Sequence, residues 1–166
     1  MKTKMTLVFA LAFIFLCGFK SKTNYVEYTD EGVVIHGNIE MLDLTCNERI
    51  AIMGMAVNEA GNQGVEGMAH VMRVALNRLE RGGYGSDLCS VIYAPSQFAM
   101  AGAPVHEFGK ECEIAYSWII HGWDETQGAL YFCSEGYNGP VPLYKYKDHW
   151  FSGKDEVLNG EKVYRG

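Results

Sequence analysis

The sequence has little positive charge and no basic cluster strong enough to bind a polyanion. Its 166 residues carry 14 Lys and Arg against 20 Asp and Glu, a formal net charge of −6. Binding to a phosphate backbone requires clustered Lys and Arg side chains. The local cluster Arg73, Arg78 and Arg81 falls within a helical periodicity, and we interpret it as a solvated helix face. We therefore expect no nucleic-acid partner.

The N-terminal apolar run is too short to be an ordinary membrane span. Residues 5–19 are uncharged and are flanked by lysines on both sides. A spanning helix needs roughly 20 apolar residues, whereas a basic start before a short apolar core is typical of a secretory signal. We expect residues 1–19 to be a cleaved signal peptide, so that the mature protein is exported and meets the membrane only through this segment. An uncleaved anchor, or a lipid on Cys17, is the alternative.

The cysteines lack the close C-x2-4-C spacing that is usual for zinc sites, so no metal is expected. Without Cys17, an even set of four remains: Cys46, Cys89, Cys112 and Cys133. Disulfides persist in exported proteins, and we expect at least one among these four. The sequence does not decide which cysteines pair. Buried free thiols are the alternative. No other cofactor is expected.

Neither internal repeats nor low-complexity segments are present, and the length suits one domain with a core that is rich in apolar residues. Residues 20–45 indicate an extended lead-in with a short hairpin. Helical patterns cover residues 46–60, 65–81, 87–92 (capped by Ser86) and 110–122, and strand patterns cover residues 128–133, 143–151 and 161–164. Helices first and short strands in the C-terminal third predict an α+β domain over residues 46–166.

A single carboxylate, Glu59, falls on the apolar face of the helix expected at 46–60. The residues that precede it at helical spacing are apolar: Ala56, Met55 and Ile52. Thr45 and Glu48 predict a capping box, and Gly61 suits a left-handed position past the C-terminus. In the last turn, the free carbonyls, the helix dipole and apolar neighbours all disfavour an ionised carboxylate. A protonated carboxyl can be donated, so Glu59 is a candidate general acid/base. A solvated glutamate at a frayed helix end is the alternative.

Four stretches resemble the SleB-type cell-wall hydrolases. They are Asn-Glu-Ala-Gly at 58–61, the run from Gly67 to Asn77-Arg78, the run at 88–98 that ends in Pro-Ser-Gln-Phe, and Gly-Ala-Leu-Tyr-Phe at 128–132. The resemblance covers about residues 47–151, and four motifs in the right order are more specific than any one of them. It implies a lysozyme-like domain that cleaves the glycan strands of peptidoglycan, in the best-known members by lytic transglycosylation, with the catalytic glutamate at Glu59.

The chain departs from the family pattern at two places. Many members have a Gly-Glu pair soon after the catalytic Glu-Ala, where this chain has Gly61-Asn62 and then Glu66. Members also tend to end on an Ile-Gly-x-His-x-Phe-Tyr strand, whose nearest counterpart here contains His149 and is followed by about 15 further residues. No separate peptidoglycan-binding repeat is present.

One carboxylate is enough for a lytic transglycosylase, whereas hydrolysis by the retaining or inverting route needs two. Positive charge that develops on the sugar ring can be stabilised by hydrogen-bonding side chains, and we expect Gln97, Tyr93 and Tyr131 to serve here. We add Glu66 and His149 to this substrate-binding set. For each tyrosine, packing in the core with a satisfied hydroxyl is the alternative.

Two other functions remain open. The first is a Cys-dependent wall peptidase, with Cys89 or Cys46 as nucleophile and His70 or His149 as base, although no cysteine has a recognisable nucleophile context. The second is a non-catalytic secreted binding protein on the same fold. A histidine within a helix, such as His70, is more often structural. In every case we expect a monomer.

Overall fold

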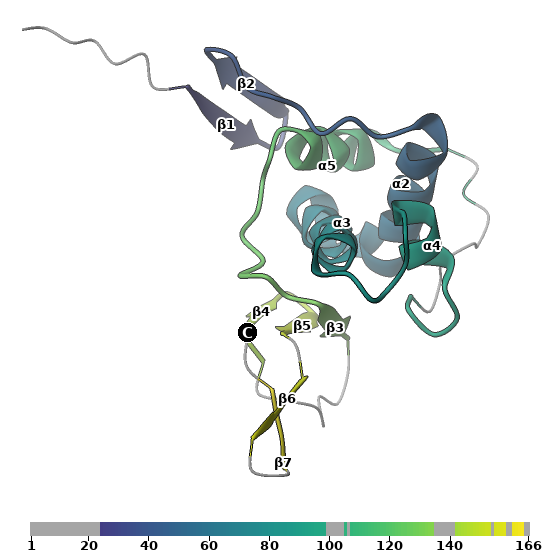
Figure 1. Cartoon of the computed structure of the whole chain (residues 1–166). Helices are drawn as coiled ribbons and strands as arrows, with labels where there is room; N and C mark the ends of the chain where they lie inside the picture. Colours follow the sequence, from purple (N-terminus) through teal and green to yellow (C-terminus); the bar gives the residue numbers. More distant parts are fainter. Residues whose placement is uncertain are drawn as a thin grey trace, which may run out of the picture.

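The structure is a computed structural model that describes residues 24–98, 105, 107–134, 142–153, 155–158 and 161–164. The expected signal peptide, Cys17 and most of the loop after residue 98 lie outside the described residues. The helices come first: α2 (Cys46–Ala60), α3 (Gly64–Arg81), α4 (Leu88–Tyr93) and α5 (Lys110–Ile120). Short strands follow, and together they form the α+β arrangement of Figure 1. The predicted fold class is confirmed.

Helix α3 is the central element. It packs against α2, α4 and α5, and Figure 1 shows the sheet on the side of α3 away from α5. Met68, Met72 and Ala75 lie in the main core. Val74 packs with Ala129 and Phe151 in a second cluster. Because the buried residues of α3 belong to both clusters, this helix is buried on more sides than a surface helix. It therefore fixes the sheet relative to the other helices.

Helix α2 begins as the sequence predicts and ends differently. The hydroxyl of Thr45 accepts a hydrogen bond from the backbone N–H of Glu48, whose carboxylate accepts from the Thr45 backbone N–H. At the other end Gly61 is right-handed, with φ −58°, and not left-handed as predicted. The chain continues through a 3₁₀ turn (Gly61–Gln63), and Gly64, with φ 76°, supplies the left-handed residue. Glu59 therefore lies beside a tight turn and not beside a frayed end.

The C-terminal strands form an antiparallel sheet in the order β3-β5-β4, from β3 (Tyr131–Cys133), β4 (Tyr144–Tyr146) and β5 (His149–Ser152). The sequence predicted one strand over 143–151. The structure has a hairpin there, because Lys147 adopts φ 45° and reverses the chain at residues 147–148. The turn brings His149 opposite Tyr146.

Two further hairpins flank this body. The lead-in folds as β1 (Tyr25–Thr29) and β2 (Gly32–His36), which confirms the expected hairpin. It is tied to the end of α5, because the Tyr28 hydroxyl donates to the His121 carbonyl at 2.8 Å and the Trp118 indole donates to the Thr29 carbonyl at 3.0 Å. The last strands, β6 (Asp155–Leu158) and β7 (Glu161–Tyr164), pair with each other. None of the helices within the described ranges is long and apolar enough to cross a membrane.

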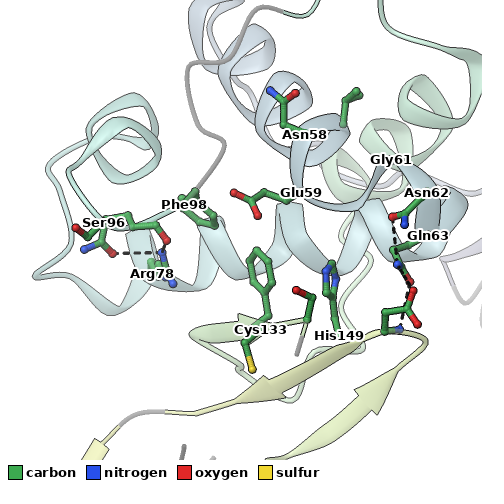
Figure 2. Close-up of a pocket in the computed structure, with 15 residues that line it drawn as sticks. Asn58, Glu59, Gly61, Asn62, Gln63, Arg78, Ser96, Phe98, Cys133 and His149 are labelled. Carbon is green, nitrogen blue, oxygen red and sulfur yellow. Dashed lines mark hydrogen bonds between the residues drawn. The ribbon is translucent and has the colours of Figure 1, made fainter. Parts of the chain in front are cut away.

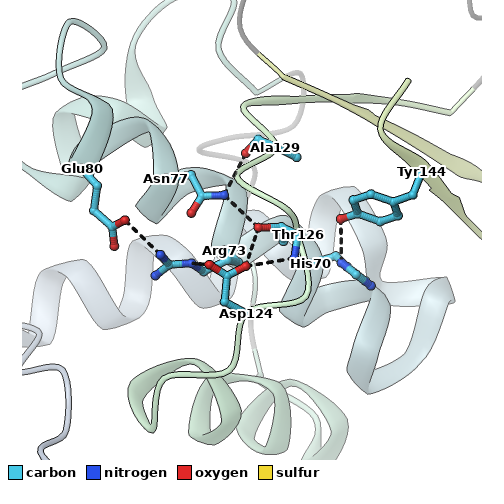
Figure 3. A network of polar contacts seen from close by, with 8 residues as sticks. All are labelled: His70, Arg73, Asn77, Glu80, Asp124, Thr126, Ala129 and Tyr144. Atoms are coloured by element: carbon cyan, nitrogen blue, oxygen red, sulfur yellow. Dashed lines mark hydrogen bonds and ion pairs between the residues drawn. The ribbon is translucent and has the colours of Figure 1, made fainter. Parts of the chain in front are cut away.

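A polar network attaches the segment that leads into the sheet to α3 (Figure 3). Asn77 donates to the Thr126 hydroxyl and to the Ala129 carbonyl, both at 2.9 Å. The Thr126 hydroxyl donates to Asp124 at 2.6 Å, and Arg73 donates to Asp124 at 2.8 Å. Thr126 is fully buried. Buried polar groups are tolerated only when they are paired, and this network pairs them.

The disulfide prediction is wrong. All four cysteines in the described part of the chain are free thiols. They lie on four different elements: Cys46 begins α2, Cys89 is in α4, Cys112 is buried in α5 and Cys133 ends β3. The Cys112 thiol is directed at the backbone carbonyl of Met53, at 3.7 Å, and not at another sulfur. A smaller correction concerns α4, whose N-cap is Asp87, paired with Ser90, and not Ser86.

Candidate active site

A cleft of about 1020 Å³ lies between the end of α2, the last turn of α3 and the sheet. Its walls come from segments far apart in the sequence: the turn after α2, the loop after α4, strand β3 and the β4–β5 turn (Figure 2). The residues that line it are Val57, Asn58, Glu59, Gly61, Asn62, Gln63, Arg78, Ser96, Gln97, Phe98, Phe132, Cys133, Ser134, Asp148 and His149.

Glu59 is half-buried in this cleft, between a cation and an imidazole. Its helix buries Ile52, Met55 and Ala56, as predicted, and this places the carboxylate on the inward side of α2. Figure 2 shows Arg78 on one side of Glu59 and His149 on the other. The carboxylate acts electrostatically on both, because it raises the pKa of each against the effect of burial.

Arg78 is buried at 4% exposure and does not belong to a solvated face, which corrects that interpretation. Its Nε donates to the Leu130 carbonyl at 2.6 Å, and its Nη1 donates to the backbone and side-chain oxygens of Gln97 at 3.0 and 3.2 Å. The guanidinium also lies 4.4 Å from the centre of the Phe98 ring. Burial lowers its pKa from an ordinary value so high that the side chain remains charged. Helical spacing gave no sign of this role; the Asn77-Arg78 pair that ends the second of the four motifs was the available signal.

Gln97 takes its orientation from Arg78. A guanidinium only donates hydrogen bonds, so the amide oxygen of Gln97 must face Arg78. Ser96, directly before it, has φ 63°, a left-handed conformation that turns the chain at the wall of the cleft. Phe98 is 7% exposed and anchors the end of this short wall in the main core. The sequence-predicted residue Gln97 thus lies in the same cleft as Glu59.

His149 lines the cleft at 5% exposure, on the first residue of β5. Its ring centre lies 5.2 Å from that of Phe132. Burial lowers the pKa of His149, while Glu59 and then Asp148 oppose that shift. The imidazole is therefore neutral at pH 7, with one donor and one acceptor nitrogen in the cleft.

The family model described as "Cell Wall Hydrolase" matches residues 62–157, more than half of the chain. The chain belongs to the cell wall hydrolase family. The matched range begins just after Glu59 and does not include it. The candidate role of Glu59 therefore depends on its place in the lining of the cleft. No curated protein matches this chain.

A solved structure shows the same fold. The crystal structure of the catalytic domain of the Bacillus cereus SleB protein aligns with a TM-score of 0.57 and 21% sequence identity. The alignment covers 69% of this chain and 97% of that domain. The similarity to SleB-type proteins that the motifs indicated is confirmed at the level of family and fold.

The remaining predicted site residues, Tyr131, Tyr93 and Glu66, do not line the described cleft. The Tyr131 hydroxyl is hydrogen-bonded to that of Tyr84 at 2.7 Å, and the Arg78 guanidinium lies 5.4 Å from the centre of the Tyr131 ring. Tyr93 ends α4 and is 52% exposed. Glu66 accepts a hydrogen bond from the Tyr146 hydroxyl at 3.1 Å.

His70 is a structural residue of the hydrolase. It is 3% exposed, and its Nδ1 is 2.9 Å from the Tyr144 hydroxyl. Burial lowers the pKa of His70 to about 4. Two titratable neighbours have smaller effects: Asp124 raises this pKa and His149 lowers it. Within the described part of the chain, no three His, Cys, Asp or Glu side chains are arranged to hold a metal ion.

Proposed function

We propose that the cleft cleaves glycan strands of peptidoglycan by lytic transglycosylation, with Glu59 as the general acid/base. The observation that supports this most is the position of Glu59 inside the cleft, between Arg78 and His149. Family membership gives the cell wall as the target. Protonation by a positioned carboxyl contributes roughly 10²–10⁴-fold to rate.

In the proposed reaction, the Glu59 carboxyl first protonates the glycosidic oxygen. Its conjugate base then takes the proton of the C6 hydroxyl of the muramic ring, and the C6 oxygen attacks C1 to give a 1,6-anhydro end. The sugar carries positive charge at C1 between these steps. Gln97 and the neutral His149 are placed to hydrogen-bond the sugar, while Tyr131 supports the wall through Arg78.

Within the described part of the chain, the other carboxylates near the cleft favour a mechanism with one acid/base over one with two. Glu66, which the departure from the family pattern brought forward, does not line the cleft and accepts from Tyr146. Asp148 does line it, but its Oδ2 accepts a hydrogen bond from Gln63 at 3.0 Å. Attack by water needs a second carboxylate that is available to activate it.

A thiol mechanism is the other enzyme reading. Cys46 and Cys89, the nucleophiles considered from sequence, do not line the cleft, whereas Cys133 does. Figure 2 shows the Cys133 sulfur pointing away from Glu59. Burial raises the pKa of the Cys133 thiol, which disfavours the thiolate that a nucleophile needs. We expect a Cys133→Ala enzyme to retain its activity.

The test is mass spectrometry of muropeptides released from purified peptidoglycan. Wild-type protein should release fragments with 1,6-anhydro ends. Reducing ends would keep the glycosidase and replace the mechanism by water attack, while intact strands with cleaved peptides would replace the function. Protein that binds peptidoglycan without releasing fragments would support the non-catalytic reading. We further propose that residues 1–19 export the protein, that residues 20–45 lead into the catalytic domain over residues 46–166, and that it acts as a monomer.

A further inference from the structure

Two turns that adjoin the cleft meet each other directly. The turn Gly61–Gln63 follows the helix that carries Glu59, and the turn at 147–148 precedes His149. These turns are about 85 residues apart in the sequence. Gln63 joins them, so one residue links the segment that follows Glu59 to the segment that precedes His149.

Gln63 is 3% exposed and binds the second turn at three points. Its Nε2 donates to Oδ2 of Asp148 at 3.0 Å, and its Oε1 accepts from the Asp148 backbone N–H at 3.4 Å. Its own carbonyl accepts from the Lys147 ammonium. The amide can have only this orientation, because a carboxylate only accepts and a backbone N–H only donates.

The surrounding backbone leaves room for this contact. A Cβ on Gly67, one helical turn after Gln63, would lie 2.1 Å from the Gln63 Cβ, which no side-chain rotation can move, so any larger residue there would displace Gln63 together with its backbone. Gly64 has φ 76° and Lys147 has φ 45°. A left-handed lysine is conformationally unfavourable, and it persists where surrounding contacts hold it.

We propose that Gln63 is a positioning residue. Its two side-chain hydrogen bonds with Asp148, called the clasp below, fix the general acid/base Glu59 relative to His149. This inference rests on the proposed glycan cleavage. A misplacement of about 1 Å at a reacting group lowers a rate by roughly 100-fold. Loss of the Gln63–Asp148 contact therefore lowers kcat by a larger factor than it raises KM, since His149 shifts but the substrate-binding wall formed by Gln97 is held separately by Arg78.

The decisive experiment exchanges donor and acceptor. Gln63→Glu sets two carboxylates against each other, so kcat on peptidoglycan should fall by roughly 10- to 100-fold at pH 7. Below about pH 5, one carboxyl takes a proton and donates again, so kcat relative to wild type should recover. Gln63→Glu combined with Asp148→Asn restores a donor–acceptor pair and should recover kcat at pH 7. Normalisation to wild type at each pH removes the pH dependence that the two proteins share; the charged and titratable groups that adjoin the Gln63–Asp148 contact are His149, Glu59 and Lys147.

Two further variants complete the design. Gly67→Ala displaces Gln63 without changing a polar group and should lower kcat to a similar extent. Gln127→Glu makes the same chemical change at an exposed position outside the cleft and should have wild-type kcat. Thermal unfolding of every variant at every pH identifies the folded samples to be compared.

The outcomes separate this inference from the proposed function. Wild-type protein that does not cleave glycan strands overturns the function and the clasp together. If wild type is active and Glu59→Gln is inactive, unchanged kcat in Gln63→Glu overturns the clasp alone. A loss of kcat that is equal at every pH, and that the double variant does not recover, also overturns it.

Discussion

One guanidinium nitrogen of Arg78 holds Gln97 by two hydrogen bonds, to the backbone carbonyl at 3.0 Å and to Oε1 at 3.2 Å. The same guanidinium donates from Nε to the Leu130 carbonyl. Hydrogen bonds from a charged donor are roughly twice as strong as neutral ones. A buried charge on α3 therefore joins the loop after α4 to the chain that enters β3, and it builds one wall of the cleft.

Arg78→Lys should weaken both the fold and the activity, because an ammonium lacks the planar fork that reaches Leu130 and Gln97 together. We expect the free energy of unfolding to fall by roughly 2–4 kcal/mol, the effect of losing charge-assisted hydrogen bonds in a buried site. Denaturant unfolding measures it. Arg81→Lys, on the exposed end of the same helix, is the matched control and should change stability by less than about 0.5 kcal/mol. Equal effects at the two positions would contradict this role for Arg78.

Glu59→Gln keeps the shape and the hydrogen-bonding capacity of the side chain but removes the transferable proton. Glycan cleavage should fall by roughly 10²–10⁴-fold while the unfolding temperature stays near that of wild type. Release of soluble fragments from peptidoglycan measures the rate. Glu66→Gln, outside the cleft, should lower the rate by less than about tenfold. A Glu59→Gln enzyme with wild-type activity would refute the site.

Acid should destabilise the protein through His70. Its pKa is near 6.5 in the unfolded chain and about 4 in the native state, so between these values the unfolded chain binds the extra proton. The free energy of unfolding should therefore fall as the pH drops from about 6.5 to 4, by roughly 2–4 kcal/mol. His149, whose pKa is also lowered, acts with the same sign. Urea unfolding from pH 7.5 to 4 measures the slope, and His70→Gln should flatten it; an unchanged slope would exclude His70 as its source.

Thr126→Val removes the hydroxyl that links Asn77 to Asp124 and preserves the volume of the side chain. Because Thr126 is fully buried, the loss should cost about 1–3 kcal/mol of unfolding free energy. Glu125→Gln, at the exposed neighbouring residue, is the control. A Thr126→Val protein as stable as this control would show that the network contributes nothing to stability.

The thiols should differ in their reaction with an alkylating reagent. Cys46 is exposed and should react first in the native protein. Cys112 is buried, and burial raises the pKa of its thiol to about 12, so it should react only after unfolding. Peptide mass spectrometry of samples alkylated before and after denaturation, without a reducing agent, measures the order. A cysteine that stays unmodified after unfolding would be in a disulfide, against the structure.

The sequence by itself determined the features that depend on local spacing. The apolar periodicity of residues 46–60 and 65–81 gave two long helices, the Thr45 and Glu48 pair gave the cap of the first, and the order of patterns gave the α+β class. The same periodicity put Glu59 on the inward side of its helix. These features could be predicted because an amphipathic helix and its cap are set by residues within a few positions of each other.

Only the tertiary structure decided which segments form the walls of the cleft and which contacts join them. Gln63 finds Asp148 across about 85 residues, and Arg78 finds Leu130 and Gln97 on two separate segments. No periodicity encodes such pairs, because a buried donor can be satisfied by any acceptor that the fold brings near it. The helical pattern of Arg73, Arg78 and Arg81 was therefore compatible with a solvated face. Arg78 is part of the site because the fold buries it in the wall of the cleft. The cysteines follow the same logic, since whether two thiols meet depends on where their elements pack and not on how many there are.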